Sequence, residues 1–471
     1  MDVNERVRTA PPFGSGAWTR GRLSVLAAIG LTLSLALAAC GGGGTTPAPS
    51  TGGASQPPAT AGGSSGPDAT SAAGACPSAA QGQSIEMWSP LTGPDGETMT
   101  ALANRFSSEN SMGIKVAHVP QPDYVQKLNA AAAAKGLPAM TVVRVINVGE
   151  LAARNVLKPY SAEALAALGD ITGDFPDNVW TQGEYKGQRY SIPLDIHPLV
   201  MYYNKAMFQA AGVEAPGSEP LTKEAFESLL GKLKDSGVQP IAIGDGFNGA
   251  TLFQTFIRQF GGALTNAEGT QVTFGSDAGV QALTYIRDIR KQYSQAISGA
   301  GDPEVGVFKQ KQAAIVIHGP WHISDLQKLD FVGFAPVPKI GNDYAVWAGS
   351  HQLGLTTDDP AKQAAAACWV KWLSDNSVEW AKAGQVPARN AVRDDPKLKE
   401  LAPAISAVAP IAPGAVILPQ VPELEGALWG QFGPAVDAVL QGSATDIKAT
   451  LEQAAQQSQQ VVDDNASRYG S

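Results

Sequence analysis

The sequence predicts an α/β protein built as two lobes, and three observations carry that prediction. The body of the chain, from about Gln83 to Ser471, comprises about 390 residues, which is too long for one simple core. Between residues 84 and 155, short apolar strands alternate with amphipathic helices, a rhythm typical of a sheet covered by helices on both faces. Apolar residues make up 44% of the chain, an ordinary share for a globular protein.

The first 39 residues have the pattern of a signal peptide. An uncharged apolar run extends from Leu23 to Ala39. Positive charge remains on the cytoplasmic side while such a run enters the export machinery, and four arginines precede it here: Arg6, Arg8, Arg20 and Arg22. The run is slightly short for a stable membrane span, so we expect residues 1–39 to be removed on export.

Leu37-Ala38-Ala39-Cys40 resembles the lipobox of bacterial lipoproteins, in which the cysteine thiol takes a diacylglycerol. A tract of Gly, Ser, Thr, Pro and Ala follows to about Ala75, almost without charge and without an aromatic residue. Such a tract cannot bury enough apolar surface to offset the entropy of ordering it. We therefore expect residues 40–82 to be a lipidated cysteine and a disordered tether. An ordinary signal peptide with an accidental cysteine, or a retained helix, is the alternative.

The mature chain is acidic. Removing the four arginines and two acidic residues of the signal peptide leaves 30 basic and 41 acidic residues, a net charge of −11. No cluster of Lys and Arg is present of the kind that nucleic acid requires. No second apolar run approaches membrane-spanning length. We therefore expect no nucleic-acid partner and a soluble body outside the cell.

Two cysteines, Cys76 and Cys368, remain once Cys40 carries the lipid. An exported protein can join them as a disulfide, but Cys368 also fits as a small core residue on an apolar helix face. The sequence leaves both options open. The absence of CxxC or Cys/His spacing argues against a structural zinc site.

Strands and helices alternate through the first half of the body. The continuous β-branched run at residues 141–148 suits a buried parallel strand. The helix at residues 96–109 places Leu102, Ala103 and Phe106 on one face. The expected strands are residues 84–88, 114–119 and 141–148, and the expected helices are residues 96–109, 123–134 and 149–155.

The second half continues with strands and longer helices, of which the one after Thr222 has a clear N-cap. From Pro396 the chain is rich in Pro and Ala, and it ends in a polar, Gln-rich helix. The expected strands are residues 190–193, 199–203, 313–317, 331–336 and 344–355, and the expected helices are residues 204–211, 222–236, 276–293, 361–373 and 446–463.

Three motifs in this order resemble the family 1 extracellular solute-binding proteins, the sugar-binding receptors of ABC importers. The most specific is the segment 185–212, which contains Tyr202-Tyr203-Asn204-Lys205 after an aromatic residue and a proline. The second runs from Phe308 through an apolar strand to Gly319-Pro320-Trp321. The third joins residues 368–374 to the Gly384-to-Arg389 turn. The resemblance covers nearly the whole mature body.

This resemblance implies a two-lobed periplasmic-binding-protein-like fold of type II, with a hinged cleft between the lobes. We expect residues 84–195 and 331–357 in the first lobe, and residues 196–330 and 358–471 in the second. The implied function is capture of a mono- or oligosaccharide and its delivery to the transmembrane subunits of an ABC permease, with no catalysis and no cofactor. We expect a monomer, held by lipid on the extracytoplasmic face of the cell membrane.

One corner of the cleft departs from the family pattern. Many members have an acidic residue after the proline that precedes the strand at residue 141, whereas this chain has Pro138-Ala139-Met140. The strand is retained, but the departure puts a ligand contact at that corner in doubt.

A sugar presents an apolar face of C–H bonds and a ring of hydroxyls, so its site needs aromatic plates and polar side chains. Trp321, Trp88 and Trp347 each lie at the end of a strand or in a turn, where an indole can project into a cleft. Each would also fit a core. Trp369, Trp372 and Trp380 have helical spacing and are interpreted as packing residues.

Four polar residues complete the expected ligand site. Asp195 and His197 alternate after the interlobe proline and therefore share one strand face. Arg389 follows a proline in a turn, where it could reach a ligand or form a surface ion pair. Asp95 lies in the Gly93-Pro94-Asp95-Gly96 turn, a position that also favours Asp for backbone reasons alone.

Enzyme and metal functions have little support in the sequence. No Gly-x-Ser-x-Gly elbow or P-loop is present. His318 and His322 are four residues apart, but Gly319-Pro320 between them breaks the helix that this metal-ligand spacing requires. We therefore expect no bound metal.

Three other functions are open. A binding protein of the same family could take a polyol or a glycerol phosphodiester. A secreted glycan hydrolase would need two carboxylates about 5–10 Å apart across the cleft, and Asp195 has no evident partner in the sequence. A structural surface lipoprotein would show no closure on ligand.

Overall fold

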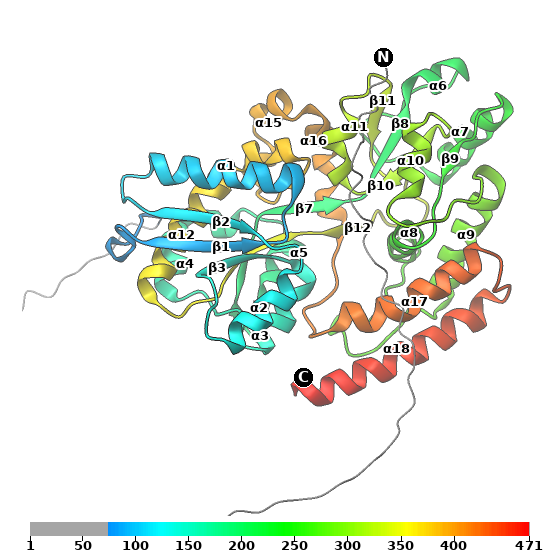
Figure 1. Ribbon diagram of the computed structural model, residues 1–471. Coiled ribbons are helices and arrows are strands. Elements are labelled where there is room, and N and C mark those ends of the chain that lie inside the picture. The colour runs from blue at the N-terminus through cyan, green and yellow to red at the C-terminus, as the bar shows by residue number, and fades with distance from the viewer. Residues whose placement is uncertain (1–73, 471) are drawn as a thin grey trace, which may run out of the picture. The chain divides into compact units, whose positions relative to one another are not determined.

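The computed structural model describes residues 74–470, and Figure 1 shows how their helices and strands are arranged. The expected signal peptide and the expected lipidation site Cys40, with most of the expected tether, lie outside these residues. Among the helices described, none is both long and apolar enough to span a membrane.

The first sheet has five strands in the order β2-β1-β3-β13-β6. β1 runs parallel to β2 and β3, while β13 runs antiparallel to β3 and β6. These strands are β1 (Ser84–Ser89), β2 (Lys115–Pro120), β3 (Met140–Arg144), β6 (Ser191–Pro193) and β13 (His351–Leu355). β3 is shorter than the expected strand, because a 3-10 turn begins at Val145.

Helices cover both faces of this sheet, as the alternating pattern predicted. On one face, Met99 and Phe106 of α1 share a core with Trp369 of α12. On the other, Leu128 of α2 packs with Leu151 of α3. The helices of this part are α1 (Gly93–Glu109), α2 (Tyr124–Ala133), α3 (Val148–Ala153), α4 (Ala162–Leu168), α5 (Asp177–Trp180) and α12 (Pro360–Asp375).

The second sheet has four strands in the order β11-β8-β10-β9. They are β8 (Val200–Asn204), β9 (Ile241–Ala242), β10 (Ile315–His318) and β11 (Val332–Ala335). A separate core that includes Phe253 and Phe432 joins this sheet to α8 and α17. The helices here are α6 (Lys205–Ala210), α7 (Lys223–Asp235), α8 (Phe247–Gln259), α9 (Asp277–Tyr293), α10 (Pro303–Lys309), α11 (Ile323–Leu326), α17 (Leu424–Leu440) and α18 (Ile447–Tyr469).

A third sheet lies where the chain crosses between the other two. Its order is β14-β7-β12-β15, with β7 (Asp195–Pro198), β12 (Val346–Gly349), β14 (Val386–Pro387) and β15 (Ala415–Val416). β7 joins β6 of the first sheet to β8 of the second, and β12 leads directly into β13 (Figure 1). Every residue from Ser191 to Asn204 is buried, so this crossing segment is covered on both faces.

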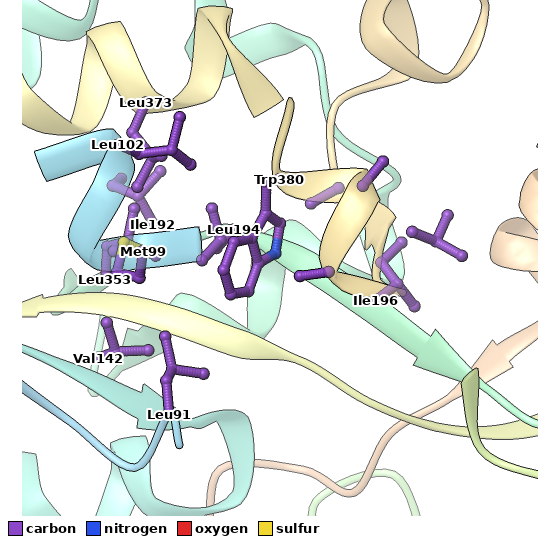
Figure 2. Close-up of a cluster of buried hydrophobic side chains, with 14 of the residues drawn as sticks. Leu91, Met99, Leu102, Val142, Ile192, Leu194, Ile196, Leu353, Leu373 and Trp380 are labelled. Carbon is purple, nitrogen blue, oxygen red and sulfur yellow. The ribbon is translucent and has the colours of Figure 1, made fainter. Parts of the chain in front are cut away.

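Trp380 closes the core beside the crossing strand. It ends the short helix α13 (Ser377–Trp380), is fully buried, and lies in the cluster formed by α1, the first sheet and β7 (Figure 2). Leu194 and Ile196 of the same cluster are carried by the crossing segment (Figure 2). The chain then continues through α14 (Asn390–Arg393), α15 (Pro396–Leu401) and α16 (Pro403–Val408).

Two segments lie in a different part of the fold from the one expected. β11, expected in the first lobe, pairs antiparallel with β8 of the second sheet. α12, expected in the second lobe, contacts α4 and β1 of the first-sheet part. The reason is that the second and third crossings come later in the chain than expected: the chain returns to the first-sheet part through β12 and β13, and it leaves again at β15, before α17. Sequence order alone does not reveal such a return.

The expected tether ends earlier than predicted. Gly74 donates its backbone N–H to Ala166, and Ala80 is fully buried. Cys76 and Cys368 are joined by a disulfide, with Cα atoms 5.5 Å apart. Residues 76–82 are therefore fixed to α12 and belong to the folded body. The disulfide resolves the option that the sequence left open, and it is consistent with an exported protein.

We predict that loss of this disulfide destabilises the body. Cys368→Ser or Cys76→Ser should lower the free energy of unfolding by about 2–5 kcal/mol, because the crosslink restricts the unfolded chain. Urea unfolding with and without a reductant measures the change. A reductant should have no further effect on the double variant, and an unchanged midpoint for reduced wild type would contradict the prediction.

Candidate functional site: a cavity at the crossing strands

A cavity of about 730 Å³ lies at the crossing strands. Its wall draws on the first-sheet part through Asp95, Arg144 and His351, on the crossing strand β7 through His197, and on the second-sheet part through Phe247. The volume falls within the range of about 300–1,000 Å³ that is usual for small-molecule sites. The cavity is therefore built from both parts of the fold, at the place where the chain passes between them.

Asp195 lies behind this wall with no exposed surface and accepts four hydrogen bonds. His197 Nε2 donates to Oδ1 at 2.7 Å, and the backbone N–H of His351 donates to the same oxygen at 2.7 Å. His351 Nδ1 donates to Oδ2 at 2.9 Å, and Trp380 Nε1 donates to it at 2.8 Å. Both oxygens of the carboxylate are thus saturated by N–H groups from β7, β13 and α13.

These contacts set the ionisation of Asp195 and of His197. Burial alone would raise the pKa of Asp195, but the charges and hydrogen bonds of His197 and His351 outweigh it and hold that pKa well below its usual range. Burial lowers the pKa of His197 in spite of the adjacent carboxylate. Asp195 engages His197 Nε2 and His351 Nδ1, so the second nitrogen of each ring, His197 Nδ1 and His351 Nε2, is available to a ligand, and both residues line the cavity.

Aromatic rings form the second-sheet side of the cavity. Phe247, the first residue of α8, has its ring centroid 5.4 Å from that of Trp347 and 5.7 Å from that of Trp321. On its other side it stacks on Trp429 at 5.7 Å. Phe247, Trp321 and Trp347 line the cavity and are only partly buried. Their faces and edges can cover the apolar side of a ligand.

Two amide side chains at the wall have an unsatisfied polar atom. Gln254 of α8 is 5% exposed, and its Nε2 has no hydrogen-bond partner among the described residues. Gln385 is 1% exposed, and its Oε1 is likewise without a partner there. Both residues line the cavity. A buried donor or acceptor without a partner costs about 1–3 kcal/mol, so both atoms favour a polar ligand that can satisfy them.

Two carboxyl groups of the wall have raised pKa values. Burial raises the pKa of Asp95 to about 6, although His351 and the hydrogen bond from Gln385 Nε2 at 3.0 Å act to lower it. Burial raises the pKa of Glu425, in the first turn of α17, to about 7, with Arg144 acting in the opposite direction. Both groups therefore exchange protons close to neutral pH.

The structure brings four of the seven expected ligand residues to the cavity: Asp95, His197, Trp321 and Trp347. Asp195 lies one layer behind them and orients the imidazoles instead of facing the cavity. That the four residues at the cavity bind the ligand is a prediction.

Two expected residues lie away from the cavity. Trp88 packs against the small core beneath α2 and α3 and donates its indole N–H to Glu86. Arg389 forms ion pairs with Asp174, at 2.8 Å, and with Asp375. Asp174 is distant from Arg389 in the sequence, and Asp375 ends α12. No local pattern in the sequence indicates either ion pair.

Several wall residues were not anticipated, among them Phe247, Gln254, Gln385, Arg144 and Glu425. Phe247 follows Gly244-Asp245-Gly246, a turn in which Gly246 has φ +64°. That glycine-containing turn was the signal in the sequence that could have indicated Phe247, because it places the first residue of α8 at the cavity. Gln385 lies inside the Gly384-to-Arg389 motif, from which the sequence analysis named Arg389 and the cavity is lined by Gln385.

The two covered sheets and the cavity between them define a two-lobed binding protein with the type II periplasmic fold. Among solved structures, the sugar-binding protein MalE of Xanthomonas citri matches with a TM-score of 0.71 at 20% identity, covering 82% of this chain and 99% of that one. At this level of identity the likeness establishes the fold.

The chain matches the family described as bacterial extracellular solute-binding protein over residues 101–405, and it belongs to that family. It is 24% identical over 375 residues to the maltodextrin-binding protein MdxE of Bacillus subtilis (strain 168), spanning 75% of this chain and 85% of that protein. It is also 24% identical over 335 residues to the sn-glycerol-3-phosphate-binding periplasmic protein UgpB of Escherichia coli (strain K12), spanning 66% and 75%. The resemblance drawn from the sequence is confirmed.

We predict that Asp95 makes stability depend on pH. Its folded pKa of about 6 lies above the ordinary value of 3.8, so its ionisation opposes folding. The cost is absent below about pH 4 and fully present above about pH 6. Asp95→Asn removes this cost. The gain in the free energy of unfolding of the variant over wild type should therefore be about 1 kcal/mol larger at about pH 7.5 than at about pH 5.

Urea unfolding at the two pH values measures this difference. Glu97→Gln removes an exposed acidic group from the same helix and serves as the control. An Asp95→Asn effect of equal size at both pH values would contradict the assignment.

Proposed function

We propose that the protein captures a carbohydrate in the cavity at the crossing strands and delivers it to the permease of an ABC importer, with no bond made or broken. The aromatic wall of Phe247, Trp321 and Trp347 suits the C–H face of a sugar ring. The imidazoles, amides and carboxylates around it suit the hydroxyls. The two lobes are proposed to close on the ligand about the crossing strands, so that the permease can distinguish loaded from empty receptor.

The observation that carries this proposal is the combination of unsatisfied amides with aromatic rings on one wall. Gln254 Nε2 is an orphan donor and Gln385 Oε1 an orphan acceptor. A sugar hydroxyl is both donor and acceptor, so the same ligand chemistry satisfies the two atoms. The maltodextrin-binding relative supports this choice of ligand class.

A glycerol phosphodiester is the second candidate ligand. Arg144 and Arg258 line the cavity, and both are exposed there. A guanidinium recognises a phosphate through two parallel hydrogen bonds. The relative that binds sn-glycerol-3-phosphate supports this alternative. A phosphodiester would need the arginines most, whereas a neutral sugar would need the aromatic wall most.

Isothermal titration across oligosaccharides, polyols and glycerol phosphodiesters tests the proposal. A saccharide should bind, and Trp347→Ala should weaken it by about tenfold to a hundredfold, because the ring loses its apolar contact. Trp88→Ala, which lies outside the cavity, should leave the affinity unchanged. Binding of phosphodiesters alone, with a strong effect of Arg144→Ala, would favour the second candidate.

Two results would contradict the proposal as a whole. One is that isothermal titration detects no binding of any of the three ligand classes. The other is turnover of an oligosaccharide, which would make the cavity a hydrolase site. Thermal unfolding of each variant without ligand shows whether it is folded.

We further propose that the receptor is a monomer tethered to the outer face of the membrane by lipid on Cys40. Cys40 lies outside the described residues, and the lipobox Leu37-Ala38-Ala39-Cys40 is what supports the proposal. A lipid anchor with a flexible tether keeps a receptor at high effective concentration near its permease.

The anchor gives a separate prediction. Cys40→Ala should move the protein from the membrane fraction to the soluble extracellular fraction, because the thiol that takes the lipid is missing. Immunoblots of the two fractions measure this. Ligand affinity should be unchanged, since the cavity lies in the folded body. Retention of the variant in the membrane fraction would contradict lipidation at this residue.

A further inference from the structure

Four side chains of metal-binding type converge at the end of β10, outside the cavity wall. Asp302 and Glu304 lie at the start of α10, His318 ends β10, and His322 ends the adjoining 3-10 turn (Pro320–His322). His318 Nε2 lies 3.1 Å from Glu304 Oε1 and 3.3 Å from Asp302 Oδ1. His322 Nε2 lies 3.0 Å from Asp302 Oδ2. Each imidazole thus directs its Nε2 at carboxylate oxygens: His318 at Asp302 and Glu304, and His322 at Asp302.

The protein atoms alone do not satisfy this cluster. Glu304 is 1% exposed and His318 is fully buried. Glu304 Oε2 and His318 Nε2 have no hydrogen-bond partner among the described residues. In that same part of the chain, no Lys or Arg forms a salt bridge with either carboxylate. A single proton on His318 Nε2 cannot be shared between two carboxylates in good geometry, and Glu304 Oε2 is left without a hydrogen bond among the described residues.

The cluster around Asp195 provides an internal comparison. It contains two imidazoles, His197 and His351, and a single carboxylate, close enough to one another to hold an ion. There, however, both oxygens of Asp195 are saturated by N–H donors, including Trp380. A metal at that place would displace bonds already made. At the Asp302 cluster, a metal would instead coordinate atoms that lack a hydrogen bond among the described residues, Glu304 Oε2 and His318 Nε2.

We propose that Asp302, Glu304, His318 and His322 form a zinc site. Two imidazole Nε2 atoms and two carboxylate oxygens are the donor set that Zn²⁺ accepts in four-coordinate sites. The two positive charges of the ion neutralise the two carboxylates. Glu304 and His318 are buried, while Asp302 and His322 retain 32% and 17% side-chain exposure, which provides a route for the ion.

The way the chain forms this site explains why the sequence concealed it. Gly319-Pro320 does break a helix between His318 and His322, as predicted. A strand end followed by a 3-10 turn nevertheless brings both rings together, with centroids 4.7 Å apart. Gly319 is required there, because a Cβ would lie 2.0 Å from the indole of Trp321. The remaining ligands come from α10, about fifteen residues upstream.

The site has a consequence for the cavity. Trp321, which lines the cavity, lies directly before His322, and its ring centroid is 5.5 Å from that of His318. Zinc would join the turn that carries Trp321 to the start of α10. The metal is therefore structural: it holds one aromatic plate of the cavity wall in place and takes no part in chemistry.

Zinc titration of the full mature chain after EDTA treatment tests this inference. Wild type should bind about one zinc ion per chain, and its unfolding temperature should rise on binding. His322→Ala and Asp302→Asn should each weaken zinc by about 100-fold or more. Asp325→Asn, which removes an exposed carboxylate from the neighbouring α11, should bind zinc as wild type does.

A second readout does not depend on any variant. Co²⁺ in the zinc-free protein should give visible absorption of the intensity typical of four-coordinate nitrogen and oxygen ligands, and zinc should abolish it. Absence of stoichiometric zinc binding, or equal binding by wild type and His322→Ala, overturns the proposal. Binding lost in His351→Ala but kept in His322→Ala would place the metal at the Asp195 cluster and overturns it as well. None of these readouts depends on the sugar ligand.

Discussion

Asp195 is a carboxylate with no exposed surface, and it accepts N–H groups from two imidazoles, one indole and one backbone amide. Removing an isolated carboxylate from water is prohibitively costly, so this charge is tolerated only because four donors surround it. The donors come from β7, β13 and α13, segments separated by up to 185 residues. The carboxylate thus fixes three distant segments to one another at the point where the chain crosses between lobes.

The cavity depends on this arrangement. Because Asp195 takes one proton-bearing nitrogen of each ring, the opposite nitrogens of His197 and His351 are left at the cavity wall. Around them, the second lobe supplies aromatic rings and the first lobe supplies Asp95 and Arg144. A ligand that contacts both walls would favour the closed arrangement of the lobes, which is how a hinged receptor couples binding to recognition by its permease.

Much of the fold could be predicted from the sequence, and the errors have physical causes. Helices with one polar face, such as α1 and α9, were found from their periodicity, and Thr222 caps α7 as expected. α8 was missed although its apolar residues have helical periodicity, so the pattern of residues 247–259 was a signal that the sequence analysis did not use. In the site, Trp321 and Trp347 were identified from turns beside strands. Arg389 lies away from the cavity, and its ion pairs with Asp174 and Asp375 are set by tertiary contacts that no local pattern encodes.

The central claim is that a carbohydrate binds at the crossing strands, between the aromatic wall and the two oriented imidazoles. A crystal structure of the protein with the saccharide that binds it most tightly tests this most directly. We predict that the sugar lies with its C–H face on Trp347 or Phe247. Its hydroxyls should lie within hydrogen-bond distance of Gln254 Nε2, Gln385 Oε1 and at least one imidazole. A saccharide bound elsewhere on the protein, with this cavity empty, would contradict the account.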